Sequence, residues 1–229
     1  MSNNYEKNNQ AIIKGEVASE PEFSHSVLGE GFYNLTVKAN RLSDEVDVIP
    51  ITISERLMGE IKVGDVVAFG GQFRSYNKLI GEKSKLMLTL FVRNKYDPDE
   101  IAESNQISLT GFICKEPVYR TTPFGREICD LLIAVNRAYN KSDYIPCIAW
   151  GRNARFSLNL SVGEKVEIIG RMQSRDYQKR LDDGTSETRT AYEVSINSIM
   201  LSAVEDDQNY DFEAQNEQAN LNKISGADI

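Results

Sequence analysis

Apolar and polar residues alternate along several stretches of this chain, with the period of two that is typical of β-strands. In the second half of the chain, the alternation runs through residues 107–113, 131–135, 142–151, 166–172 and 192–200. Residues 152–160, between the third and fourth of these stretches, space their apolar side chains loosely, as a short helix or a turn does. The pattern therefore predicts about five strands with one helix between the third and the fourth.

The chain also contains an internal repeat that is as long as a whole domain. Residues 20–41 align with residues 116–137 without a gap, at a constant offset of 96. Two further aligned pairs are Gly15 with Gly111 at the same offset and, after three extra residues in the second copy, Gly71 with Gly170 at an offset of 99. Because this period is much longer than that of solenoid repeats, we expect two homologous domains.

The predicted order of elements indicates a particular fold. Five strands with a helix between the third and the fourth is the order of the OB-fold, a five-stranded Greek-key barrel. We therefore predict an all-β protein with two tandem OB-folds, over residues 8–96 and 105–203, each with a short helix between strands 3 and 4. Residues 204–229 form an acidic tail, which we expect to be disordered because it is rich in Asn and Gln and poor in large apolar residues.

The third strand of the second copy carries aromatic residues on one face. The face that we expect to form the core consists of Ile145, Cys147 and Ala149. Tyr144 and Trp150, the single tryptophan, lie on the opposite face, whereas the first copy has Val48 and Ser54 at these two positions. Aromatic residues in strands are more often buried, but the first face is already sufficient for a barrel core. We therefore predict that Tyr144 and Trp150 point outward.

The formal net charge of the chain is −8 at pH 7, and this charge is distributed unevenly. Residues 1–104 hold 12 Lys and Arg against 16 Asp and Glu, and residues 205–229 hold one against seven. Residues 105–204 hold 13 against 11, and nine of these 13 cations are arginines. The second copy is therefore a basic segment of an acidic chain, which permits a nucleic-acid partner there.

The fourth strand of the second copy combines cations with an aromatic residue. Arg171, Arg175 and Tyr177 alternate with residues that face the predicted core. Beside Trp150, they would form a surface on which bases stack and phosphates pair with arginines, as single-stranded nucleic acid requires. Protein interfaces also favour Tyr, Trp and Arg, so a protein-binding surface is the alternative.

The composition offers little material for other classes of function. The three cysteines form no CxxC pair, and the single histidine, His25, has no cluster of cysteines or carboxylates around it. We therefore expect free core thiols, no metal, no cofactor and no enzymatic activity. No apolar run approaches the roughly 20 residues of a membrane span, and the polar N-terminus has no signal-peptide segment, so we expect a cytoplasmic protein without membrane contact.

Residues 106–202 resemble the bacterial single-stranded DNA-binding proteins, through LTGFICKEPVYRTTPFGREICDLLIAVNRAY, YIPCIAWGRNARFSLNLSVGEKVEIIGRMQSR and TAYEVSINSIML. The resemblance implies sequence-independent binding and protection of single-stranded DNA during replication, recombination or repair, in association with the nucleoid. The aromatic residues that would stack with bases are Tyr139, Tyr144, Trp150 and Tyr177. The residues that would contact phosphates are Arg171, Arg175 and Arg189, with Arg120, Arg126 and Arg137 as further candidates.

The first copy departs furthest from this family pattern. Its candidates for a weaker subsite are Arg41, Arg74, Tyr76 and Lys78. Because the first copy has fewer stacking groups and a net negative charge, we expect the second domain to be the main DNA-binding domain. Replacing Arg74 and Tyr76 by alanine would then leave DNA affinity almost unchanged.

The resemblance also bears on assembly and partners. Family members with two folds per chain dimerise, which implies a homodimer with four OB-folds. Members usually end in acidic residues followed by a hydrophobic tip that recruits replication and repair proteins, whereas this chain ends in GADI. Partner recruitment through the acidic tail is therefore a hypothesis, and the tail could instead compete with DNA or aid solubility. The alternative for the whole chain is a replisome or primosome accessory that acts mainly as a protein adaptor.

Overall fold

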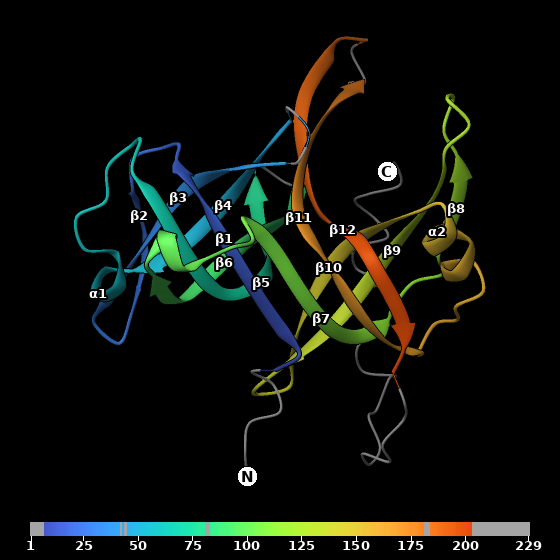
Figure 1. The fold of residues 1–229 in the computed structure, drawn as a ribbon, viewed down its shortest axis with the longest axis horizontal. Helices are drawn as coiled ribbons and strands as arrows, with labels where there is room; N and C mark the ends of the chain where they lie inside the picture. The colour runs from blue at the N-terminus through green and yellow to red at the C-terminus, as the bar shows by residue number, and fades with distance from the viewer. Residues whose placement is uncertain (1–6, 42, 44, 81–82, 181–183, 203–229) are drawn as a thin grey trace.

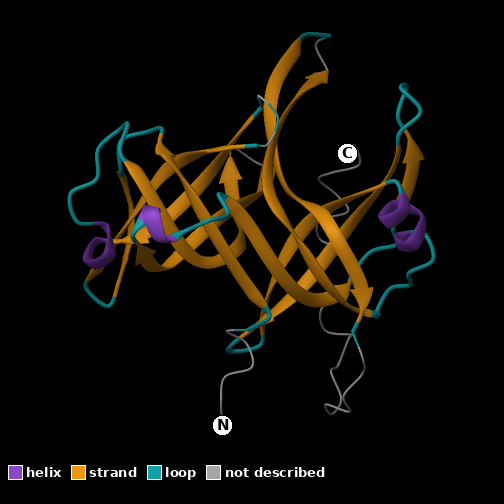
Figure 2. Ribbon diagram, in the orientation of Figure 1, coloured by secondary structure: helices purple, strands orange, loops and turns teal. Residues whose placement is uncertain are grey.

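The computed structural model of the chain describes residues 7–41, 43, 45–80, 83–180 and 184–202, and its strands form two β-barrels side by side (Figures 1 and 2). The strands of the first barrel region are β1 (Asn9–Val17), β2 (Glu22–Val27), β3 (Glu30–Asn40), β4 (Val46–Ser54), β5 (Val66–Ile80) and β6 (Lys83–Tyr96). Those of the second are β7 (Asn105–Ile113), β8 (Val118–Thr121), β9 (Glu127–Arg137), β10 (Lys141–Trp150), β11 (Lys165–Arg180) and β12 (Ser186–Leu201). The helices are α1 (Glu55–Met58), α2 (Arg152–Ser157) and the short 3-10 helix η2 (Pro98–Glu100). The predicted acidic tail, residues 204–229, lies outside the described residues.

Each barrel closes because its first strand pairs with two others. β1 pairs with β3 and β5, and β7 pairs with β9 and β11, so backbone hydrogen bonds run around each ring of five strands. The third and fifth strands of each ring, β4 with β6 and β10 with β12, are parallel. Helix α1 follows β4 and helix α2 follows β10. These observations confirm the predicted all-β class and the OB-fold order of elements.

The alternation pattern missed two strands and overestimated one helix. β2 and β8 extend the sheet beyond β3 and β9, and neither alternates between buried and exposed residues, so neither carries a period-two signal. The helix predicted over residues 152–160 ends at Ser157. The chain tightens there, because the N–H groups of Asn159 and Leu160 donate to carbonyls only three residues back.

The internal repeat recurs in the backbone geometry. A Cβ atom at Gly15 would collide with the carbonyl group of Lys38, and one at Gly111 would lie 2.6 Å from the carbonyl oxygen of Ala134. Lys38 and Ala134 are related by the same offset as the two glycines. β5 and β11 also share a bulge, at the glycine pair that aligns at the second offset. The aligned glycines therefore mark places where two strands approach too closely for any side chain.

The core of the second barrel includes the face of β10 that the alternation predicted. Its residues are Ile145, Cys147 and Ala149, each at most 2 % exposed. Cys129 is also buried and Cys114 is half-buried, and all three cysteines are free thiols. Ile148 is 3 % exposed although it lies on the outward face, so this face is partly covered as well.

The two barrels share one sheet because their first strands pair with each other. Residues 9–13 of β1 run antiparallel to residues 105–109 of β7, and this pairing joins the barrels into a single sheet of 12 strands. Asn9 and Asn105, at the starts of these strands, each hold the bulged fourth strand of their own barrel. Each side-chain amide forms two hydrogen bonds, of 2.6 to 2.9 Å, with the N–H and carbonyl groups of one backbone residue. The repeat did not predict the shared sheet, because pairing between copies leaves no period in the sequence.

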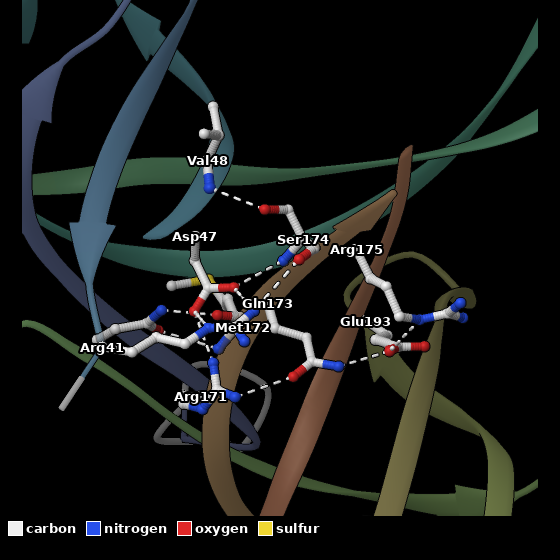
Figure 3. A network of polar contacts seen from close by, with 10 residues as sticks. Arg41, Asp47, Val48, Arg171, Met172, Gln173, Ser174, Arg175 and Glu193 are labelled. Atoms are coloured by element: carbon white, nitrogen blue, oxygen red, sulfur yellow. Dashed lines mark hydrogen bonds and ion pairs between the residues drawn. The ribbon is translucent and has the colours of Figure 1, made fainter. Parts of the chain in front are cut away.

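A buried carboxylate forms a second connection between the barrels (Figure 3). Asp47, at 1 % exposure, accepts hydrogen bonds from Arg41 at 2.6 and 2.9 Å, from Arg171 at 2.6 Å and from the backbone N–H of Ser174 at 2.9 Å. The hydroxyl of Ser174 accepts from the backbone N–H of Val48 at 2.9 Å. Arg171 and Ser174 belong to β11, whereas the other three residues belong to the first barrel region, so this network holds the barrels together.

The same connection recurs with the barrels exchanged. Asp143, also 1 % exposed, accepts from the backbone N–H of Ser75 at 2.8 Å and from Arg137 at 3.1 Å. The hydroxyl of Ser75 accepts from the backbone N–H of Tyr144 at 2.7 Å. Asp143 and Ser75 occupy the aligned positions of the first network, but the Oδ2 atom of Asp143 has no hydrogen-bond partner within the described residues. We refer to the two networks as the aspartate junctions.

Replacing Asp47 by alanine should destabilise the protein more than replacing Asp143. The first change removes four hydrogen bonds and leaves two arginines without their buried counter-ion, for which we expect a loss of about 3 kcal/mol. The second removes two hydrogen bonds and an incompletely paired carboxylate, for which we expect about 1–2 kcal/mol. Urea unfolding of the two variants measures both values, and equal losses would contradict this ranking.

The second aspartate junction should also give stability a specific pH dependence. Burial raises the pKa of Asp143 above its ordinary value of 3.8. A raised pKa in the folded state contributes stability that is complete below the unfolded pKa and is lost as the pH rises through the folded pKa. The free energy of unfolding of the wild type minus that of Asp143→Asn should therefore decrease as the pH rises from below 3.8. If this difference increases with pH, burial does not dominate at Asp143.

Candidate nucleic-acid interface

An open cleft of about 930 Å³ lies beside Trp150. Residues of the second barrel that line it include Arg126, Trp150, Arg171, Arg175 and Tyr192. Residues before and within β4 of the first barrel, Arg41, Val46 and Val48, line it as well. Both barrels therefore contribute to one cleft, whose lining combines arginines with rings.

Trp150 stands at the end of β10, where the chain turns into α2. The ring is 38 % exposed and pairs across the sheet with Ile128 of β9, on the face opposite the core, as predicted from the alternation. Gly151 follows at φ +51°, in the left-handed region that favours glycine, and its N–H donates to the carbonyl of Glu127 at 2.9 Å. This turn ends the strand directly after the ring, so Trp150 lies at the rim of the barrel.

Two of the predicted phosphate-binding arginines, Arg137 and Arg171, and one residue of the predicted weaker subsite, Arg41, take part in the aspartate junctions. Arg41 and Arg171 pair with Asp47, and Arg137 pairs with Asp143, at 2.6 to 3.1 Å. Burial lowers the pKa of Arg171, while the hydrogen bond to Asp47 raises that of Arg41. Arg171 also donates to the side chain of Gln173 at 3.0 Å, so two of its nitrogens are already engaged. These arginines join the barrels, and fewer of their N–H groups remain for a ligand.

Arg175 and Arg126 are more accessible cations of the cleft. The side chain of Arg175 is 46 % exposed, and its nearest carboxylate oxygen, on Glu193, is 3.5 Å away. Its guanidinium lies 6.0 Å from the ring centroid of Tyr177, within range of a cation–π contact. Arg126 is exposed before β9, and its guanidinium forms no ion pair within the described part of the chain. Both arginines can therefore pair with an added anion.

The remaining predicted rings do not gather around Trp150. Tyr139 is 93 % exposed in the turn between β9 and β10, at φ +62°, and Tyr177 is 38 % exposed on the extension of β11. Tyr144 is half-buried, and burial raises the pKa of its hydroxyl. It lies six residues before Trp150 on the same strand, where its backbone contacts Ser75 of the first barrel. None of these three rings lines the cleft, which holds Trp150 together with Arg171 and Arg175 of the predicted platform.

Two further predicted cations form surface ion pairs. Arg120 of β8 pairs with Asp130 at 2.8 Å, and Arg189 of β12 pairs with Glu187 at 2.9 Å. Exposed pairs of this kind are weak and are readily exchanged for another anion. Arg120 and Arg189 lie on the outer surface of the second barrel region, and neither of them lines the cleft.

In the first barrel, the predicted residues Arg74, Tyr76 and Lys78 occupy alternate positions along β5, on its outward face. Tyr76 is 44 % exposed, and Arg74 lies over the ring of Phe91 of β6, 4.2 Å from its centroid. Phe91 is not among the residues predicted from the sequence, and neither is Tyr192 in the lining of the cleft. Phe91 stands at an outward position between the core residues Leu90 and Val92, so the period-two pattern of β6 could have revealed it. Tyr192 lies on the core-facing side of β12 and packs partly against the core, so the same pattern predicts a core residue there.

Within the described residues, no group of three or more His, Cys, Asp or Glu side chains could hold a metal ion. No helix in this part of the chain is long and apolar enough to cross a membrane. His25 is exposed and stacks on Phe32.

Comparison with known proteins identifies the family. Residues 104–202 match the model of the single-strand binding protein family. Single-stranded DNA-binding protein 1 of Staphylococcus aureus (strain COL) is 36 % identical over 83 residues, 33 % of this chain and 50 % of that protein. Single-stranded DNA-binding protein B of Bacillus subtilis (strain 168) is 32 % identical over 81 residues, 32 % of this chain and 72 % of that protein. The chain therefore belongs to the single-strand binding protein family.

The similarity covers different parts of these proteins. The chain spans about half the length of the first curated relatives that it matches. The solved structure of the wild-type single-stranded DNA binding protein from Thermus aquaticus superposes with a TM-score of 0.67, over 88 % of this chain and 96 % of that one. The two sequences are 19 % identical in this superposition, so the likeness shows the fold.

Proposed function

We propose that this protein binds single-stranded DNA without sequence preference and protects it during replication, recombination or repair. One observation carries the proposal: the half-exposed ring of Trp150 opens onto a cleft that also holds the accessible guanidinium groups of Arg126 and Arg175. Bases released from a duplex expose apolar faces that a ring can cover, for about 1–3 kcal/mol each whatever the base. The phosphates between these bases pair with arginine. Family membership supports the same ligand.

Within this proposal, residues 8–96 and 105–203 act as two OB-fold domains, and the cleft of the second is the primary site. We propose two different roles for the predicted residues of this cleft. Trp150 and Arg175 contact the DNA directly, whereas Arg171 mainly positions β11 against Asp47. We further propose that the chain acts as a homodimer in the cytoplasm and carries out no catalysis. Light scattering of the purified protein measures the dimer.

Titration with oligo(dT) tests the proposed function through the intrinsic fluorescence of Trp150. Because the sequence has a single tryptophan, every change in its emission reports on this cleft. We expect strong quenching, with an affinity that falls as the salt concentration rises, since phosphate contacts release counter-ions. If oligo(dT) causes no quenching at low salt and does not co-migrate with the protein, the proposed function is wrong and an adaptor role is favoured.

The two arginines of β11 should respond differently to replacement. We expect Arg175→Ala to weaken oligo(dT) binding about three- to tenfold and to reduce the salt slope by about one, as loss of a phosphate contact does. Arg171→Ala should lower the free energy of unfolding and weaken binding less, because its guanidinium is engaged by Asp47. Arg56→Ala is the control, since Arg56 is 81 % exposed on α1 outside the cleft. A larger binding loss for Arg171→Ala than for Arg175→Ala, measured with both variants folded, would contradict these roles.

A further inference from the structure

The first barrel carries a cluster of rings and cations on its outward face. His25 of β2 stacks on Phe32 of β3, with ring centroids 5.1 Å apart and planes inclined by 9°. Phe32 stacks on Phe91 of β6, with centroids 5.6 Å apart and planes inclined by 30°. The guanidinium groups of Arg74 and Arg93 lie 4.2 and 5.3 Å from the centroid of Phe91. We call these five residues the first-barrel ring cluster.

This cluster occupies the same part of the OB-fold as Trp150 does in the second barrel. Phe32 pairs across the sheet with Ser54, just as Ile128 pairs with Trp150. Ser54 stands at the position of Trp150 in the repeat. At this pair of positions, the second barrel therefore has a ring on its third strand, beside an aliphatic residue on its second strand. The first barrel has the opposite arrangement, with a small residue on its third strand.

Phe91, the second of these phenylalanines, also has a small residue at the equivalent position of the second barrel. Phe91 of β6 pairs with Thr52 of β4, and the equivalent parallel pair in the second barrel is Ser195 with Ile148. The second barrel, whose third strand carries Trp150, therefore has Ser195 on its fifth strand where the first barrel has Phe91. The outward face of the first barrel therefore carries rings on its second and fifth strands, β3 and β6, whereas that of the second barrel carries Trp150 on its third strand, β10.

Two cations lie against the ring of Phe91 without an ion-pair partner among the described residues. Within the described residues, neither Arg74 nor Arg93 forms an ion pair with Asp or Glu, and the Nε atom of Arg74 is buried without a hydrogen-bond partner. Burial, together with the neighbouring cations Arg137 and Arg93, lowers the pKa of Arg74 to about 10, although the carboxylate of Asp143 acts in the opposite direction. Arg93 itself is exposed. An anion placed here would relieve the repulsion between these cations.

The second aspartate junction brings the second barrel close to this region. The backbone N–H of Tyr144 donates to the hydroxyl of Ser75, the residue after Arg74. The start of β10 therefore lies beside β5 of the first barrel, close to the first-barrel ring cluster. Tyr76, 44 % exposed on the same face of β5 as Arg74, lies one residue beyond Ser75.

We propose that the first-barrel ring cluster is a second subsite for single-stranded DNA, in which Arg74 and Arg93 bind a phosphate and the exposed parts of His25, Phe32 and Phe91 contact bases. The alternation of unpaired cations and rings matches the alternation of phosphates and bases along a single strand. This inference rests on the proposed function and extends it to the first barrel. It replaces the sequence-based expectation that changes at Arg74 and Tyr76 leave DNA affinity almost unchanged.

A tryptophan moved into the first barrel tests the subsite directly. The double variant Trp150→Phe/Phe91→Trp keeps a ring at both positions and places the single tryptophan in the first-barrel ring cluster. Circular dichroism and urea unfolding establish that it is folded. We expect oligo(dT) of about 35 nucleotides, long enough for two OB-folds, to quench this tryptophan.

A charge reversal provides the second measurement. Arg93→Glu changes an exposed side chain, and we expect it to weaken binding of the same oligonucleotide about five- to tenfold. Lys62→Glu, an equal charge change in an exposed turn of the first barrel, is the matched control and should have little effect. If the wild type binds oligo(dT) but the moved tryptophan is not quenched and Arg93→Glu binds like Lys62→Glu, the subsite is disproved while the proposed function stands. Absence of any binding by the wild type would disprove the proposed function itself.

Discussion

Two buried carboxylates, Asp47 and Asp143, set the relation between the barrels. Each is 1 % exposed and accepts a backbone N–H from the fourth strand of the opposite barrel. A buried carboxylate is costly unless donors surround it, so the fourth strands must stay in register with these two side chains. The pairing of β1 with β7 joins the barrels along one edge, and the aspartate junctions fix the side where the cleft beside Trp150 opens. The geometry of the proposed DNA path therefore depends on interactions that do not touch DNA.

This arrangement divides the arginines into two groups with different roles. Arg41, Arg137 and Arg171 neutralise the buried carboxylates, so their charge mainly maintains the structure. Arg126 and Arg175 keep accessible guanidinium groups and are suited to a ligand. An acidic chain can in this way present local positive charge, because its carboxylates at the junctions are already paired while its accessible arginines stand beside rings.

The two barrels carry large rings at different positions of the same outward face. The outward face of an OB-fold can carry large side chains on neighbouring strands only where the residue between them is small. The second barrel places Trp150 on its third strand, and the first places Phe32 and Phe91 on the strands at either side. A comparison of aligned positions finds a lost tryptophan, whereas the packed surface contains a compensating pair of rings. Substitution at single aligned positions is therefore a poor measure of which barrel can bind.

The sequence by itself determined the five strands of each barrel, the repeat and the core face of β10, because these depend on local alternation and on glycines at close approaches such as Gly15 and Gly111. The added strands β2 and β8 carry no alternation and were not predicted. It also determined the family, since residues 106–202 hold a long ordered pattern. Only the tertiary structure decided which cations are accessible and which rings lie together. Arg171 and Arg175 are indistinguishable along the strand and both line the cleft, yet one pairs with Asp47, 124 residues away in the chain, and the other keeps an accessible guanidinium. Phe32 and Phe91 are likewise distant in sequence, and they stack because barrel closure brings β3, β4 and β6 together.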